Sequence, residues 1–249
     1  GQWSTTHKRY SNHHEVPRPA TDLVTELRGA GYRTGLLGKN HTFLEAKDFD
    51  VWDEHPEPGN SAALRKRRRW MESTRTQYPR LAEEAVPGGI EADPAHAKTD
   101  AALRFIETDD GRPFFLWLSY LHPHSPYIVP EPFFSMYKNV TLPEPAIESQ
   151  GLAASEKPFR QQYHQKNNDA VLPFTSKQVR LMRRIYYGQI SLLDLEIGRL
   201  LDYLEQEGLA ENTLLVFTSD HGDYMGEHGL MTKSPAMYDS LVRVPFLMR

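Results

Sequence analysis

Two apolar runs constrain the fold of this 249-residue chain more than any other feature. Phe114 to Tyr120 is almost entirely apolar and aromatic, and Thr213 to Thr218 is a second run of the same kind. Short apolar runs bounded by turn residues are typical of strands that are buried on both faces. Such strands belong to parallel sheets that helices cover. The two runs therefore predict two core strands of this type.

Helical patterns alternate with these strands. Apolar spacing predicts helices over 20–30, 95–107 and 179–207, and a short strand over 32–37. One face of the last helix is expected to be buried, formed by Ile185, Ile190, Leu193, Ile197, Leu200, Leu201 and Leu204. The alternation predicts an α/β fold with a largely parallel central sheet flanked by helices. The proline-rich stretch 127–175 is expected to be a long surface excursion.

Composition excludes several classes of protein. The chain is 39% hydrophobic and 25% charged, which argues against disorder, collagen and coiled coil. Its net charge of −4 gives no electrostatic case for a nucleic-acid partner. No apolar run approaches the roughly 18 residues that a membrane span needs. Because the chain has no cysteine, disulfides, thiolate zinc sites and a Cys nucleophile are excluded within these residues.

Each predicted strand is followed by residues that can carry chemistry. They are Lys39 and His41 after the first strand, His122 and His124 after the second, and Asp220 and His221 after the third. Ligands of open α/β sheets bind outside the carboxyl ends of the strands. We therefore expect separate segments to bring these side chains to one edge of the sheet.

The segment from Asp220 to Lys233 has the strongest signal. Asp220 places a hard oxygen ligand next to the His221 imidazole, a combination that suits a divalent cation. The glycines of 222–229 allow the backbone to approach a ligand closely. Lys233 is a cation suited to an anionic substrate. The structural alternative for Asp220 and His221 is a helix cap followed by a surface histidine.

The other candidates have structural alternatives too. Lys39 and His41 could belong to a solvated turn. A proline-ordered loop with hydrogen-bonded imidazoles would equally account for His122 and His124. The basic run Arg65–Arg69 favours a solvated helix face over a site for an anionic polymer.

A series of short motifs runs in order along the chain. The motifs are Gly31-Tyr32-Arg33-Thr34, Gly38-Lys39-Asn40-His41, Pro113-Phe114-Phe115-Leu116, Pro123-His124-Ser125-Pro126, Ser219-Asp220-His221-Gly222, Gly226-Glu227-His228-Gly229, Lys233 and Arg243-Val244-Pro245. This ordered set resembles the type I, formylglycine-dependent sulfatases of the alkaline phosphatase superfamily. The Ser-Asp-His-Gly form is more similar to the branch that holds choline sulfatases, iduronate sulfatases and phosphonate monoester hydrolases.

The resemblance implies four catalytic residues. His124 and Lys233 would protonate the leaving alcohol while a hydrated aldehyde attacks sulfur. Lys39 would stabilise the aldehyde hydrate and the developing charge. His41 would help to remove the proton of the second hydroxyl group, which expels sulfate and regenerates the aldehyde.

The resemblance also implies binding residues. Asp220 and His221 would hold a divalent metal ion, expected to be Ca²⁺, with Mn²⁺ or a similar ion as the alternative. Asn12, His122 and His228 would contact the substrate or support the residues that do.

Other parts of the machinery are expected outside this sequence. The formylglycine of the family arises from Cys or Ser in a C/S-x-P-x-R motif, which this chain lacks, as it lacks the paired aspartates of the first strand. The resemblance therefore implies a partial catalytic domain over 1–249, truncated at both ends, with site segments at 31–41, 113–126 and 213–233 and variable excursions at about 45–95 and 127–178. We expect this chain alone to be inactive. The full-length protein is expected to be periplasmic, secreted or lysosomal.

The expected activity is hydrolysis of sulfate esters, with a sulfated carbohydrate or another small sulfated molecule as substrate. One alternative is a phosphonate or phosphate diester hydrolase, because both reactions pass through anionic transition states that a metal can stabilise. Another is a relative that binds sulfated glycans without catalysis. The oligomeric state is left open.

Overall fold

A computed structural model describes residues 19, 21–55, 62–73, 81–108, 110–145, 174–233 and 237–249. The chain divides into two compact units. The first comprises residues 1–58 and 94–121, and the second comprises residues 59–93 and 122–249. Lys39 and His41 belong to the first unit, whereas the histidines that follow Leu121 and the segment from Asp220 to Lys233 belong to the second.

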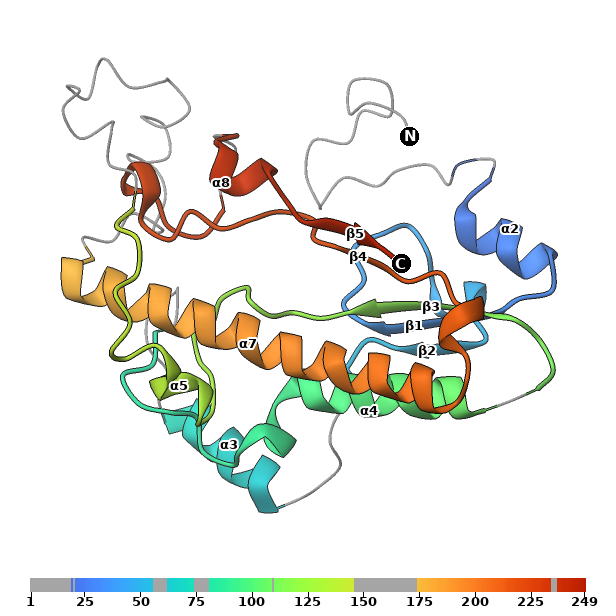
Figure 1. Ribbon diagram of the computed structural model, residues 1–249, viewed down its shortest axis with the longest axis horizontal. Helices are drawn as coiled ribbons and strands as arrows, with labels where there is room; N and C mark the ends of the chain where they lie inside the picture. The colour runs from blue at the N-terminus through green and yellow to red at the C-terminus, as the bar shows by residue number, and fades with distance from the viewer. Residues whose placement is uncertain are drawn as a thin grey trace. The chain divides into compact units, whose positions relative to one another are not determined.

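The first unit is built on a parallel sheet. β1 (Arg33–Gly38) lies between β2 (Val51–Asp53) and β3 (Phe114–Ser119), and both neighbours run parallel to it. Helix α2 (Leu23–Gly29) contacts β1, and helix α4 (Pro94–Glu107) contacts β1 and β3 (Figure 1). The central position explains why every residue of β1 is buried. The predicted parallel sheet with flanking helices is confirmed.

Helix α2 begins and ends at residues suited to helix termini. The Asp22 carboxylate accepts a hydrogen bond from the backbone nitrogen of Thr25 at 2.9 Å, which caps the amino end of the helix. Gly31 follows the carboxyl end with φ of 89°, a left-handed conformation that favours glycine. Arg28 Nη1 donates to the carbonyl oxygen of Lys47 at 2.9 Å, which ties the helix to the 3₁₀ turn η1 (Ala46–Asp48).

Helix α4 packs closely on β1 because residue 35 is glycine. A Cβ atom at Gly35 would lie 2.7 Å from the ring of Phe105. The same ring covers the buried guanidinium group of Arg33, whose Cζ lies 4.5 Å from the ring centroid. Arg33 Nη2 also donates to the Phe105 carbonyl oxygen at 2.8 Å. The helix thus satisfies a charge that the sheet would otherwise bury without a partner.

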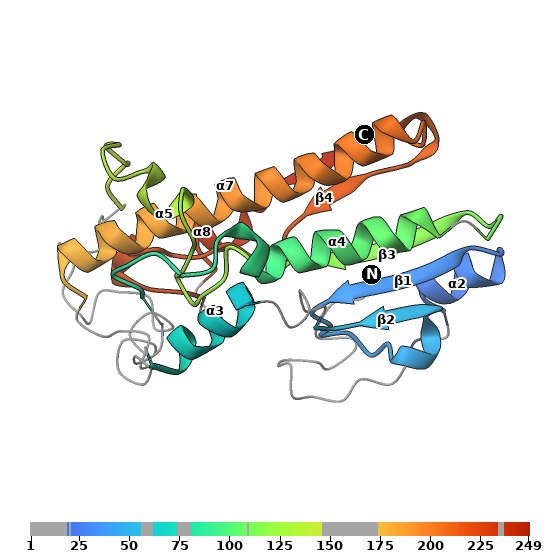
Figure 2. The ribbon, with the colours of Figure 1, turned by 90° about the horizontal axis from the view of Figure 1, so that it is seen from below.

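The second unit is organised along the long helix α7 (Ser176–Gln206). Thr175 and Gln178 form a capping box at its start: the Gln178 nitrogen donates to Thr175 Oγ1 at 3.3 Å, and the Thr175 nitrogen donates to Gln178 Oε1 at 2.9 Å. Helix α5 (Phe133–Met136) lies against α7 (Figure 2). This approach requires glycine at position 188, because a Cβ atom there would lie 2.5 Å from the Phe133 carbonyl oxygen.

The largest core cluster of the second unit joins α7 to the residues that follow β3. Its members are Tyr127, Val129, Phe133, Met182, Ile185, Leu192, Met225 and Met231. Tyr127 and Val129 are completely buried. The prediction of a surface excursion over 127–175 is therefore wrong for its first residues, whose side chains fill the core.

The buried face of α7 differs from the predicted one. Ile185, Leu193 and Leu204 are buried as expected, but the side chain of Ile190 is 40% exposed. Gln189 and Glu196 are buried in its place. The reason is that both polar side chains find partners inside: Gln189 Nε2 donates to the Pro126 carbonyl oxygen at 3.0 Å, and Glu196 Oε2 accepts from Arg199 Nη1 at 2.6 Å.

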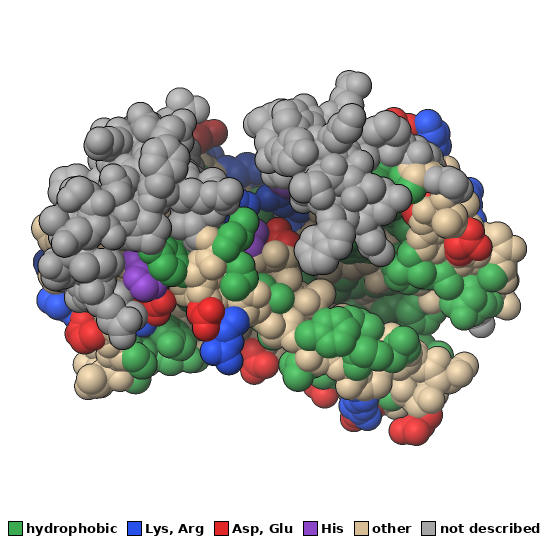
Figure 3. Space-filling model, turned by 90° about the horizontal axis from the view of Figure 1, so that it is seen from above, with side chains coloured by type: hydrophobic (Ala, Val, Ile, Leu, Met, Phe, Trp, Pro, Cys, Tyr) green, Lys and Arg blue, Asp and Glu red, His purple; other side chains and the backbone are tan. Residues whose placement is uncertain are grey.

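Two short strands pair antiparallel in the second unit. β4 (Val216–Thr218) pairs with β5 (Phe246–Met248). The prediction of a fully buried strand over 213–218 is wrong, since the strand begins at Val216 and that side chain is 49% exposed. Among the described strands β4 has only β5 as a neighbour, so its other edge has no described partner strand. Exposed hydrophobic side chains are visible in Figure 3.

Strand β3 also departs from the prediction. Phe114–Ser119 forms the expected strand, but its side chains are half-buried, and that of Trp117 is exposed. Among the described strands β3 pairs with β1 alone, at the edge of the sheet. Its apolar composition indicates a central strand, whereas the described sheet places it at an edge.

The basic run lies on helix α3 (Ala62–Ser73). Arg67 points inward, where its Nη2 lies 3.8 Å from Asp93 Oδ2, while the other four basic side chains are exposed. The apolar side of the helix, through Trp70 and Met71, packs on a small cluster with Val86 and Ile128. A solvated helix face is therefore the better description of this run. The remaining short elements are η2 (Ile90–Ala92), η6 (Ala210–Asn212), η7 (Glu227–Gly229) and α8 (Asp239–Val242).

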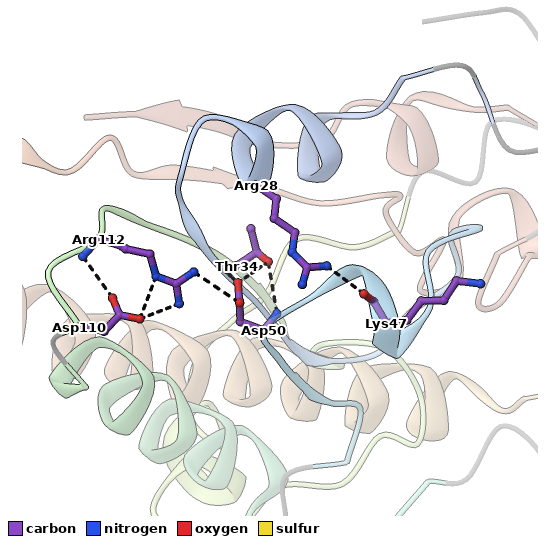
Figure 4. Close-up of polar contacts among 6 residues, drawn as sticks. All are labelled: Arg28, Thr34, Lys47, Asp50, Asp110 and Arg112. Atoms are coloured by element: carbon purple, nitrogen blue, oxygen red, sulfur yellow. Dashed lines mark hydrogen bonds and ion pairs between the residues drawn. The ribbon is translucent and has the colours of Figure 1, made fainter.

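A closed polar cluster lies at the amino ends of the strands in the first unit (Figure 4). We call Thr34, Asp50, Asp110 and Arg112 the Arg112 cluster. Asp50 Oδ2 accepts from the backbone nitrogen of Thr34 at 2.8 Å and from its Oγ1 at 3.1 Å. Arg112 Nη1 lies 3.5 Å from Asp50 Oδ1, and its Nη2 donates to Asp110 Oδ2 at 2.6 Å. Every charge in this cluster faces an opposite one.

Candidate active site

The loop after β3 is anchored through His122. Its Nε2 lies 2.8 Å from Oδ1 of Asp93, a carboxylate whose side chain is 1% exposed. Gln189 Nε2 on helix α7 lies 3.2 Å from His122 Nδ1. A carboxylate accepts and an amide nitrogen donates, so this arrangement fixes the neutral imidazole with its proton on Nε2. Both ring nitrogens are thus engaged by protein groups, and the substrate contact of His122 stays a prediction.

His124 is held differently. Its Nδ1 donates to the carbonyl oxygen of Ser125 at 2.7 Å. A carbonyl oxygen can only accept, so the proton of the neutral ring lies on Nδ1. Nε2 carries the lone pair of the neutral ring. A ring whose orientation is fixed through its other nitrogen is the arrangement that a general acid or base requires.

The segment after β4 brings His221 and Lys233 together. Lys233 Nζ lies 2.9 Å from His221 Nε2. His221 Nδ1 donates to the Gly222 carbonyl oxygen at 2.6 Å, so its Nε2 carries the lone pair that accepts from the ammonium group. Asp220 is 85% exposed, and its Oδ2 lies 3.7 Å from the same Nε2. An oxygen and a nitrogen that can both bind a cation therefore lie side by side.

The hairpin-like loop between His221 and Lys233 explains this contact. The Tyr224 nitrogen donates to the Thr232 carbonyl oxygen at 2.9 Å, and the Gly226 nitrogen donates to the Leu230 carbonyl oxygen at 2.9 Å. These two bonds fold the chain back on itself. A Cβ atom at Gly222 would lie 1.9 Å from the carbonyl oxygen of Ser240. At this glycine the close neighbour is protein backbone, and the predicted close approach of these glycines to a ligand stays a prediction.

The loops after β3 and β4 meet. The rings of His124 and His221 lie 6.0 Å apart between centroids, in an edge-to-face arrangement. Two of the three predicted strand-end clusters thus converge, and Lys233 joins them through His221. Basic and histidine side chains are visible on the molecular surface in Figure 3.

Asp223 completes this site, although the sequence reasoning assigned it no role. Its Oδ2 accepts from the Tyr127 hydroxyl group at 2.8 Å, and its Oδ1 accepts from the Met225 nitrogen at 3.2 Å. Burial raises the pKa of Asp223 above its ordinary value, while the Tyr127 hydrogen bond and the charges of His124 and His221 oppose that rise. The feature of the sequence that could have identified Asp223 is an acidic residue inside a glycine-rich loop. We call His124, His221, Asp223 and Lys233 the imidazole cluster.

His228 lies in the same loop, within the 3₁₀ turn η7. Its ring stacks on the ring of Tyr238 at 3.8 Å between centroids and 20° between planes. Its backbone is left-handed, with φ of 54°. This conformation is uncommon for residues other than glycine and is often retained at functional loops. The predicted substrate contact of His228 stays a prediction.

Lys39 and His41 follow the end of β1 in the first unit. Gly38 before them is left-handed, with φ of 104°, and a Cβ atom there would lie 2.1 Å from the Ser119 carbonyl oxygen. Glycine thus allows β1 and β3 to end side by side. The meeting of Lys39 and His41 with the imidazole cluster stays a prediction, and Asn12 lies outside the described residues.

Asp220 and His221 are the predicted metal ligands. Asp220 supplies a carboxylate and His221 an imidazole nitrogen, and their nearest atoms are close enough to share one ion. No group of three or more such side chains occurs among the described residues. A hard cation such as Ca²⁺ takes six to eight oxygen ligands in general, so this pair is part of a site at most.

Comparison with known proteins gives a consistent result. The sequence matches the family model described as Sulfatase over residues 2–249. It is 34% identical over 250 residues to an arylsulfatase of Clostridium perfringens (strain 13 / Type A), covering 90% of this chain and 51% of that protein. It is 31% identical over 185 residues to the multifunctional alkaline phosphatase superfamily protein PehA of Trinickia caryophylli, covering 67% of this chain and 36% of PehA.

A solved structure has a similar fold. BT4656, in complex with its substrate D-glucosamine-2-N,6-O-disulfate, superposes with a TM-score of 0.66 at 21% sequence identity. The superposition covers 100% of this chain and 59% of BT4656. The chain spans about half the length, or less, of the curated relatives named above.

Proposed function

This chain belongs to the sulfatase family, and from that premise we propose that it forms part of an enzyme that hydrolyses sulfate esters. The observation that carries the proposal is the imidazole cluster. His124 and Lys233 can donate protons. The imidazole groups of His124 and His221 act on the buried carboxylate of Asp223, and Lys233 contacts His221. Such a site suits a reaction in which an anionic group is held while an alcohol leaves.

His124 is the proposed general acid. The hydrogen bond from Nδ1 to the Ser125 carbonyl oxygen fixes the ring, and it leaves Nε2 to carry the proton that the leaving alcohol needs. Lys233 adds a second positive charge close to His221. Protonation of the leaving oxygen removes the cost of expelling an alkoxide.

Sulfatases generally use a divalent metal ion and a formylglycine residue. Asp220 Oδ2 and His221 Nε2 fit as two of the ligands, since both are accessible and lie 3.7 Å apart. A bound ion supplies charge that neutralises the sulfate group. His221 Nε2 has one lone pair, which can bind either the ion or the ammonium group of Lys233. With the ion bound, Lys233 would therefore be available to contact the substrate. Ca²⁺ is the proposed ion.

The nucleophile is proposed to come from residues outside this sequence, because no C/S-x-P-x-R motif occurs in it. A sulfated carbohydrate is the proposed substrate class, and its support is the disulfated sugar bound to BT4656. None of the described helices combines the length and the low polarity needed to cross a bilayer. A periplasmic, secreted or lysosomal location is part of the proposal.

Turnover of paired model substrates tests the proposal. The longest natural polypeptide that contains this sequence is assayed with an aryl sulfate and with the matching aryl phosphonate monoester, with Ca²⁺ present. We expect the sulfate ester to have the larger kcat/KM. A larger value for the phosphonate would favour the second candidate, a phosphonate or phosphate diester hydrolase, whose support is the similar fold of the phosphonate monoester hydrolase of Agrobacterium radiobacter. If neither ester is hydrolysed, the result would favour the third candidate, a relative that binds sulfated glycans without catalysis.

A further inference from the structure

A basic pocket lies on the amino-terminal half of α7, outside the imidazole cluster. It has a volume of about 290 Å³ and lies between α7 and the segment 138–144. Arg180, Arg183 and Arg184 line it from the helix, and Lys138 lines it from the segment. One carboxylate, that of Glu144, is also in the lining. Four cations against one carboxylate give the pocket an excess of positive charge.

The three arginines lie on one face of the helix, because residues spaced three and four apart are neighbours there. Like charges at this spacing repel each other. No hydrogen bond or ion pair is formed by Arg180 or Arg184 within the described residues, and Arg183 Nε is buried without a hydrogen-bond partner there. A guanidinium group offers several donors in a fixed plane that matches an oxyanion. Because these guanidinium groups have unused hydrogen-bond donors and an excess of positive charge, the pocket suits an anionic ligand.

The opposite wall of the pocket is held in place. Tyr137, next to Lys138, places its hydroxyl oxygen 2.8 Å from Ser191 Oγ on α7. Its ring also lies 5.5 Å from the ring of Tyr187 between centroids. The segment 138–144 therefore starts from a fixed point on the helix. It contributes apolar side chains, including Val140 and Leu142, which suit the apolar face of a sugar ring.

The pocket borders the loop that carries Asp223. Arg183 Nη1 donates to the Met225 carbonyl oxygen at 3.1 Å, so one arginine contacts both the pocket and this loop. A Cβ atom at Gly226 would lie 2.8 Å from Val179 Cγ1 and 3.5 Å from Pro145 Cγ. These two residues adjoin the two walls of the pocket. The loop that carries Asp223 therefore connects the imidazole cluster with the border of the basic pocket.

We propose that this pocket binds an oxyanion group, a sulfate or a carboxylate, on the sugar ring next to the ring that carries the scissile ester. The proposal rests on the proposed function and adds to it a preference for substrates with more than one negative charge. Free inorganic sulfate has the same chemistry, so the experiment separates the two sources.

Calorimetric titration with matched ligands tests the proposal. The ligands are a disaccharide with one 6-O-sulfate, the same disaccharide with a second sulfate on the neighbouring ring, and inorganic sulfate. All titrations use the longest natural polypeptide that contains this sequence with His124→Ala, so that no ester is hydrolysed. We expect the second sulfate to tighten binding about tenfold, as charge-assisted hydrogen bonds to guanidinium do. Each of Arg180→Gln, Arg184→Gln and Lys138→Gln should abolish most of that gain.

Lys177→Gln is the matched control, because it removes one charge from the same helix outside the pocket lining. It should keep the gain from the second sulfate. Lys138 lies off the helix, so its variant tests the pocket even if a helix variant fails to fold. The proposal is overturned if the second sulfate adds nothing, if the gain survives in the pocket variants, or if inorganic sulfate alone accounts for all variant-sensitive binding. Aryl sulfate turnover by the unmodified protein is measured in parallel, so failure of the proposed function appears there and not in these titrations.

Discussion

The Arg112 cluster and the imidazole cluster both combine acidic and basic side chains, but their charges are balanced differently. In the first, each charge lies next to an opposite one. In the second, the groups that can be positively charged are in excess. In the Arg112 cluster, partial burial alone would raise the pKa of Asp50, but the hydrogen bonds from Thr34 and the charge of Arg112 hold it below its ordinary value. In the imidazole cluster, burial raises the pKa of Asp223. There the nearest described partner of Lys233 Nζ is an imidazole nitrogen, His221 Nε2, at 2.9 Å.

The difference distinguishes a cluster that stabilises the fold from one that can act on a ligand. Arg112 has its donors directed at Asp50 and Asp110, so an added ligand would have to break existing bonds. His124 and His221 each use Nδ1 on a backbone carbonyl oxygen and keep Nε2 for exchangeable partners. Unbalanced charge with exchangeable donors is the property that catalysis needs.

The largest expected effect concerns the chain as a whole. The imidazole cluster supplies acids and cations but no nucleophile, so the 249 residues alone should show no multiple turnover of an aryl sulfate. The measurement is hydrolysis by the purified chain with added Ca²⁺, after circular dichroism has confirmed that it is folded. Turnover above that of a Lys39→Ala, His124→Ala double variant would place the nucleophile within this sequence and contradict the assignment.

Removal of His124 should have the next largest effect. In the longest natural polypeptide that contains this sequence, His124→Ala should lower kcat by about 10³-fold, within the range for a lost general acid. Arg112→Ala is the control from the other cluster and should leave kcat unchanged per folded molecule. Equal kcat values for the two variants would abolish the distinction between the clusters.

Lys233→Ala should lower kcat by roughly 10²-fold, the scale for a lost charge contact in the transition state. Lys233→Arg keeps the charge and should recover part of the activity. A kcat unchanged in the alanine variant would show that Lys233 supports His221 structurally without acting on the substrate.

Asp50 should matter for stability and not for turnover. Asp50→Ala removes hydrogen bonds to a charged acceptor and should lower the free energy of unfolding by about 2 kcal/mol. Because the folded pKa of Asp50 is lowered, its contribution is present above the unfolded pKa of about 4 and is lost as pH falls through the folded value. Urea unfolding at pH 7 and at pH 3 should therefore show a smaller difference between Asp50→Asn and the unmodified protein at the lower pH. A stability difference that is larger at pH 3 than at pH 7 would contradict a lowered pKa of Asp50 in the folded protein.

The smallest effect is expected for Arg112→Ala. Arg112 is well exposed, and exposed ion pairs contribute little in water. Its variant should lower the melting temperature less than Asp50→Ala does, and added salt should reduce that loss further. A loss that exceeds the Asp50 effect would mean that Arg112, and not Thr34, holds Asp50 in place.

The periodicity of apolar residues predicts where the longer helices and strands lie, but it does not predict which of their side chains are buried. The alternation of apolar residues predicts α2, β1, α4, β3 and α7 within a few residues of their observed bounds. It fails for Ile190 on α7, because Gln189 and Glu196 occupy core positions through hydrogen bonds that a hydrophobic pattern does not register. It fails for Val216 because burial depends on how many strands flank β4, which the strand's own composition does not specify.

In the candidate site, too, the sequence identified some residues and missed others. Motif order identified His124, His221 and Lys233, which the structure brings together. Asp223 was missed because its role depends on Tyr127, a residue 96 positions away in the chain. The two nitrogens of His122 could not be assigned either, since Asp93 and Gln189 come from different elements. Long-range partners decide the protonation state of a histidine, and a short motif contains only local ones.

The fold-back between His221 and Lys233 limits how this region can change in evolution or by engineering. Backbone bonds from Tyr224 to Thr232 and from Gly226 to Leu230 fix the number of residues on each arm. A single inserted or deleted residue on either arm would shift the register and rotate Lys233 away from the His221 ring. An addition at the turn near Glu227 lies beyond the inner bond and would leave the register of the two arms unchanged. Grafting experiments that vary substrate preference should therefore exchange this hairpin whole, or lengthen it at its tip.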